Sequence, residues 1–166
     1  TNGDSGHVSL STFNGGVTSG AVSGNVDVFT GPSSHGSSRS ITVSSGDAAN
    51  SSSDSGSGGA IVLNVGSGGA LVGGHVMITS GETTNGAASG AAGGNIVLNA
   101  GVGAGTSAHG GSITINGGLG SDTGNGGSVV VSSGSSTNGD SGHVSLSTFN
   151  GGVTSGAVSG NVDVFT

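Results

Sequence analysis

Apolar residues along this chain gather in short alternating clusters that are separated by stretches rich in glycine and serine. Each cluster begins near a glycine or another small residue and reads apolar, any residue, apolar. Alternation of this kind, bounded by glycine and serine, is the signature of a β-strand. Helical spacing is not seen, and each glycine would cost a helix about 1 kcal/mol. The first apolar positions of the clusters recur at similar intervals: Val8, Val26, Ile41, Ile61, Val76, Ile96, Ile113, Val129 and Val144.

The chain also repeats itself over a longer distance. Residues 1–30 and 137–166 are identical, so that Thr1 recurs as Thr137. We interpret 1–136 as one repeat unit with two diverged halves, 1–68 and 69–136, and 137–166 as the start of the next identical unit. Repetition of this kind predicts a periodic architecture in which each repeat packs on its neighbours.

The expected fold is all-β, a parallel β-solenoid with glycine- and serine-rich corners. The residue between the two apolar positions alternates in character from one cluster to the next. It is mostly polar in one set and mostly valine in the other, which favours a coil of about 34 residues with two main strands. A coil of about 17 residues with one strand is the alternative. The first set is Ser9, Thr42, Met77 and Thr114, and the second is Asp27, Val62, Val97 and Val130.

Composition alone would favour a different structure. Glycine accounts for 40 of the 166 residues, aromatic residues for 2% and charged residues for 5%. Glycine- and serine-rich chains are typically flexible linkers. The clustering of valine, isoleucine and leucine changes this interpretation, because clustered apolar residues can offset part of the entropy lost on ordering.

Charge and the length of the apolar runs argue against two classes of partner. The net charge is −7, and Arg39 is the only basic residue apart from the histidines. A nucleic-acid-binding protein needs basic residues to displace counterions from phosphates, so nucleic acid is not expected as a partner. Membrane insertion is not expected either, because no apolar run approaches the roughly 20 residues that a spanning helix needs.

The sequence predicts no catalytic, cofactor-binding or metal-binding residue, and the protein is not expected to be an enzyme. Each histidine is isolated in the sequence, whereas metal sites usually bring several ligands together at short spacing. The carboxylates recur in no fixed register that would suggest a calcium-binding repeat. The glycine-rich stretches lack the lysine of a phosphate-binding loop, because the chain contains no lysine.

Two features are candidates for sites of another kind. Asn50 begins the sequence Asn-Ser-Ser, an acceptor motif for N-linked glycosylation. Val62, Val97 and Val130 lie between two apolar neighbours, so these clusters are apolar on both faces. A strand that is apolar on both faces is usually buried on both. We therefore expect these three valines to form a lateral contact between copies of the protein.

The strands GGNIVLNAG, GGSITINGG and GGAIVLNVG resemble the repeats of secreted bacterial filamentous adhesins that fold as β-helices. The runs SGHVSLST and SVVVSSGSSTNGDSGHV look more like long secreted fibrous repeat proteins of diatom-like algae. The resemblance implies an extracellular protein, secreted or held at the cell surface. The expected function is that of a structural subunit of a filament, self-associating end to end and laterally. An adhesin stalk or an ice-binding solenoid is the alternative.

Overall fold

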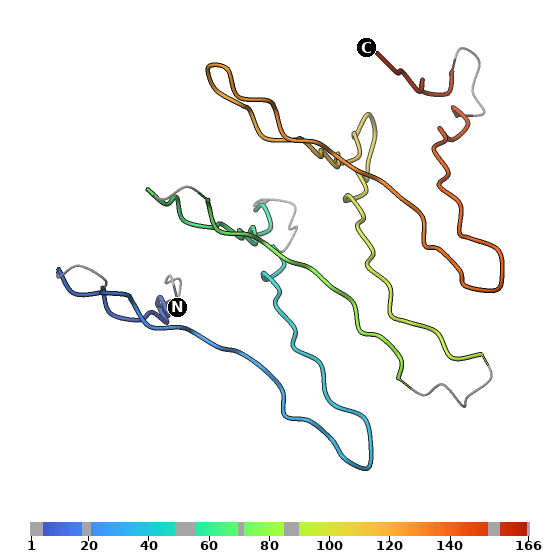
Figure 1. Ribbon diagram of the computed structural model, residues 1–166. Coiled ribbons are helices and arrows are strands. Elements are labelled where there is room, and N and C mark those ends of the chain that lie inside the picture. The colour runs from blue at the N-terminus through green and yellow to red at the C-terminus, as the bar shows by residue number, and fades with distance from the viewer. Residues whose placement is uncertain are drawn as a thin grey trace. The chain divides into compact units, whose positions relative to one another are not determined.

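The computed structural model describes residues 5–17, 21–48, 56–69, 72–84, 90–152 and 157–165. These residues form neither a helix nor a strand, as Figure 1 shows by the lack of coiled ribbons and arrows. The described chain is coil, with turns at 106–107 and 122–123 and bends at 34–36 and 137–139. The prediction of an all-β parallel solenoid is therefore wrong, both for the longer coil with two strands and for the shorter coil with one.

The chain divides into two units, Thr1–Met77 and Ile78–Thr166, which we call the first and the second unit. Within each unit, drawn-out segments alternate with reversals of the chain (Figure 1). The drawn-out segments contain the apolar clusters, and the reversals contain the linkers between them. The sequence pattern therefore locates the segments correctly, although these segments do not pair as strands.

Each reversal closes where the residues that follow one cluster meet the residues that precede the next. We call the two residues at which a reversal closes its neck. In the second unit, four necks are each held by one backbone hydrogen bond between two glycines. The bonds run from Gly94 N to Gly81 O (2.8 Å), from Gly111 N to Gly101 O (2.9 Å), from Gly127 N to Gly118 O (2.8 Å) and from Gly142 N to Gly134 O (2.9 Å).

Side chains close two of the necks in the described part of the first unit. The Thr12 hydroxyl donates to the Gly24 carbonyl at 3.1 Å. The Thr30 hydroxyl donates to the Arg39 carbonyl at 3.0 Å. A short polar side chain that bonds to nearby backbone is a usual way to stabilise a turn without strand pairing. Both kinds of neck join residues that are close in sequence, so each reversal is a local structure.

The two identical stretches fold back at the same place. A Cβ added at Gly15 would lie 2.9 Å from the carbonyl carbon of Val22, and one added at Gly151 would lie 2.6 Å from that of Val158. These two pairs occupy equivalent positions in the two identical stretches. The backbone approaches closely at both points, which only glycine permits. The same local sequence therefore gives the same reversal in both units.

The solenoid prediction fails for two physical reasons. Parallel pairing needs a crossover that carries the chain back to the start of the next strand. Here each neck instead brings the chain back beside the residues that it has just left. The hydrogen bond that closes a neck is not followed, in the described residues, by further bonds that would form a ladder. A solenoid also buries its apolar residues between stacked coils. No residue of the described part is buried, so the positions expected to face a core have none to face.

The solvent-exposed surface area also shows that the chain is not packed around a core. The chain exposes 16094 Å². Two separate compact units of half its mass would together expose about 8,500 Å², by the usual scaling of surface with mass. The excess is roughly 7,500 Å².

Gly117 provides a test of the necks. A Cβ at Gly117 would collide with the carbonyl oxygen of Gly127, whereas one at Gly118 would meet nothing within 4 Å. We expect Gly117→Ala to open this neck and to break the bond from Gly127 N to Gly118 O. One hydrogen bond contributes about 0.5–1.5 kcal/mol, so hydrogen exchange at the Gly127 amide should become about two- to tenfold faster. Gly118→Ala is the matched control, and an equal acceleration in both variants would contradict the geometry.

Candidate self-association surface

The two apolar positions of each cluster differ consistently in exposure. The first positions named above, apart from Val8, expose 50–59% of their surface, and the second positions, two residues later, expose 65–78%. In the necks closed by Gly94, Gly111, Gly127 and Gly142, the first apolar residue follows two residues after the neck glycine. The returning chain partly shields it there, while the second position lies farther along the segment. Both positions remain open enough to contact another molecule.

The three valines predicted as a lateral contact are among the exposed apolar residues. Val62 and Val97 expose 71% of their surface and Val130 exposes 81%. Val62 belongs to the first unit, whereas Val97 and Val130 lie on different segments of the second unit. The three valines thus come from three separate segments. Their role as a contact between copies stays a prediction, and Asn50, the predicted glycosylation site, lies outside the described residues.

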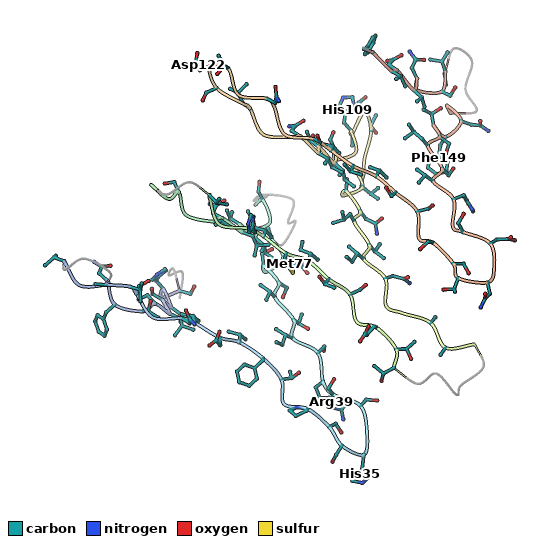
Figure 2. All side chains as sticks on the ribbon, in the orientation of Figure 1. His35, Arg39, Met77, His109, Asp122 and Phe149 are labelled. Carbon is teal, nitrogen blue, oxygen red and sulfur yellow. The ribbon has the colours of Figure 1, made fainter. Side chains whose placement is uncertain are left out.

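Three of the titratable residues that Figure 2 labels, His35, His109 and Asp122, lie on reversals, whereas Arg39 begins the drawn-out segment 39–45. Asp122 lies at the tip of the reversal closed by Gly118 and Gly127, with a left-handed backbone (φ 54°). His35 lies at the tip of the reversal closed by Thr30 and Arg39, 3.0 Å from the Ser34 hydroxyl through its Nδ1. Among the described residues, no group of three histidines or carboxylates converges as metal ligands would. Nor does the described part enclose a pocket for a small molecule.

Charge is distributed unevenly along the sequence. Between Glu82 and Asp140, Asp122 is the only charged residue. Three drawn-out segments of this region, 94–100, 111–117 and 127–133, carry no charge and no proline, and we call them the uncharged segments. Elsewhere, segment 24–30 includes Asp27 and segment 39–45 includes Arg39, whereas segment 59–65 also carries no charge. Another molecule can therefore approach the uncharged segments without meeting a charge on them.

Sequence reasoning missed the importance of the necks. It interpreted the glycines as corners of a coil, whereas eight of them form the four Gly–Gly necks of the second unit. A signal for this was present in the sequence. A pair of glycines precedes three of the clusters of this unit, at 93–94, 110–111 and 126–127, and the second glycine of each pair donates the bond that closes the neck.

In the described part of the chain, no helix could span a membrane. Comparisons of this chain with protein-family models, with curated proteins and with solved structures gave no match.

Proposed function

We propose that this protein is a structural subunit of an extracellular filament, assembled by self-association and without catalysis. The observation that carries the proposal is the exposure of the apolar clusters. Every large apolar side chain recorded for the described residues keeps at least 45% of its surface exposed. Soluble monomers rarely expose large contiguous apolar patches, and larger ones usually mark sites of association. Burial against further copies would supply the apolar contacts that the single chain lacks.

The energetics favour ordering on assembly over ordering alone. Fixing the backbone of one residue costs roughly 1–2 kcal/mol, whereas a single neck hydrogen bond returns about 0.5–1.5 kcal/mol. Burying one valine or isoleucine side chain contributes about 1.5–3 kcal/mol. The regular recurrence of the clusters gives every stretch of the chain such side chains to bury. An assembly that buries them along its whole length is a filament rather than a closed dimer.

Composition supports the extracellular location. With one arginine and no lysine, the chain offers trypsin-like proteases a single cleavage site, after Arg39. A sequence built mainly from glycine, serine and small apolar residues also resembles secreted fibrous proteins, as described above. These features fit a material that persists outside the cell.

Salt provides a direct test of self-association. The net charge of −7 makes copies repel one another. Raising the ionic strength from 0.01 to 0.15 M shortens the Debye length from about 30 to about 8 Å. We expect the concentration at which filaments appear to fall roughly tenfold over this range, because screening removes the repulsion but leaves apolar burial intact. Sedimentation and negative-stain electron microscopy would measure this.

The control changes charge without touching an apolar cluster. Asp47→Asn together with Glu82→Gln lowers the net charge from −7 to −5, and it should assemble at lower salt than the parent. A chain that stays monomeric at every concentration and salt tested would overturn the proposed function.

A further inference from the structure

The uncharged segments combine three properties that favour association through the backbone. They are drawn out, they are rich in valine and isoleucine, and their side chains are exposed (Figure 2). Within the described residues, their backbone–backbone hydrogen bonds involve only the first residue of each segment, namely Gly94, Gly111 and Gly127. The remaining amide and carbonyl groups have no such bond to the described backbone. Unpaired backbone along an extended segment is a template for another chain.

We propose that each uncharged segment pairs, backbone to backbone, with the same segment of a second copy of this chain. This inference rests on the proposed function and names the contact that produces it. The second copy adds a strand to the open edge of the first, as in other cases of association by strand addition. The pairing occurs between molecules, and the isolated chain keeps the reversals described above.

The absence of charge fits a second copy as the partner. When identical segments pair in register, each residue lies opposite its own counterpart. A charged residue would then face a like charge, which is destabilising. Segment 24–30 would place Asp27 against Asp27, whereas the uncharged segments avoid this cost entirely. Short segments with high β-propensity, low net charge and no proline are those that form such stacks.

The position of Asp122 fits this arrangement. Its carboxylate lies at the tip of the reversal between segments 111–117 and 127–133, and not on either segment. Like charges from two copies would meet at the exposed end of a reversal, where solvent and salt screen them.

Proline at polar positions of these segments tests the pairing. Asn99→Pro, Asn116→Pro and Ser132→Pro, combined in one chain, remove one backbone donor from each uncharged segment and leave every apolar side chain in place. Proline also keeps the preceding residue extended, so the segments stay drawn out. The control chain carries Asn99→Ala, Asn116→Ala and Ser132→Ala. It loses the same polar side chains but keeps the three backbone N–H donors.

We expect the parent and the alanine control to assemble and to give fibre diffraction with a spacing of about 4.7–4.8 Å between paired strands. The proline variant should need at least a tenfold higher concentration to assemble and should give no such reflection. Assembly of the proline variant at the parent's concentration, with the reflection retained, would overturn the pairing of these segments. Parent filaments that lack the reflection would also overturn it and leave the proposed function standing. A parent that never assembles would overturn both.

Discussion

Replacing Val62, Val97 and Val130 together with lysine is expected to abolish the lateral association of filaments. Each substitution removes an exposed valine and places an ammonium group where the proposed contact excludes water. Losing the valine costs the contact about 1.5–3 kcal/mol, and burying an unpaired charge costs several kcal/mol more. We therefore expect at least a hundredfold rise in the concentration needed for bundles. Because Val97→Lys and Val130→Lys also place like charges opposite each other in the paired segments, the concentration needed for filaments should rise as well. Electron microscopy of filament width and sedimentation would measure both.

The change in net charge requires a matched control. Three lysines shift the net charge from −7 to −4, which by itself weakens repulsion and favours association. Ser33→Lys, Thr106→Lys and Thr123→Lys make the same change at exposed positions of reversals. This control should bundle at least as readily as the parent. If the valine variant formed bundles of unchanged width and yield, these residues would not be the lateral contact.

The dilute chain is expected to show no cooperative thermal unfolding transition. Cooperative melting requires a buried core, and no residue of the described part is buried. A compact domain of this length would unfold with a heat-capacity increase of about 2–2.5 kcal/mol/K and an enthalpy of roughly 115 kcal/mol near 60 °C. Differential scanning calorimetry at low concentration should detect neither, because little apolar surface is newly exposed on heating.

Assembly should restore a transition. Filaments at high concentration bury apolar clusters, so their dissociation on heating should absorb heat at a temperature that rises with concentration. The Gly118→Ala chain is a suitable control, because its added methyl meets open space and should change neither result. A sharp, concentration-independent transition of the full enthalpy in the dilute chain would contradict the absence of a core.

The sequence predicts the local features of this molecule much better than the long-range ones. Alternation around Ile96, Ile113 and Val129 locates the drawn-out segments, because alternation is a property of a few adjacent residues. Pairing depends on which distant segment lies alongside, and the pattern is nearly the same in every cluster. The sequence therefore contains little information that would select one register over another. Closure of the glycine necks depends instead on two stretches of backbone that approach closely. The spacing of the apolar residues does not predict that approach.

The same distinction applies to the candidate surface. Exposure of Val62, Val97 and Val130 agrees with a role outside a core, but their immediate neighbours are exposed as well. The prediction assigned one face of each strand to a core and the other face to a contact with another molecule. Without a core, the two faces cannot be told apart in this way. The absence of charge from Thr83 to Ser121 could be read directly from the sequence. This absence of charge matters because, in the structure, the backbone of segments 94–100 and 111–117 is not paired through a ladder of hydrogen bonds.

The local closure of the reversals has a consequence for how such a sequence evolves. Each neck described above joins residues within the same short stretch, so among the described residues none of these bonds reaches a distant repeat. Unequal recombination between identical stretches such as 1–30 and 137–166 would add or delete one whole period of the repeat. Every remaining reversal would keep its geometry after such an event. If 1–136 is one unit of a longer array, as the repeat predicts, the number of periods can change while the described reversals stay intact.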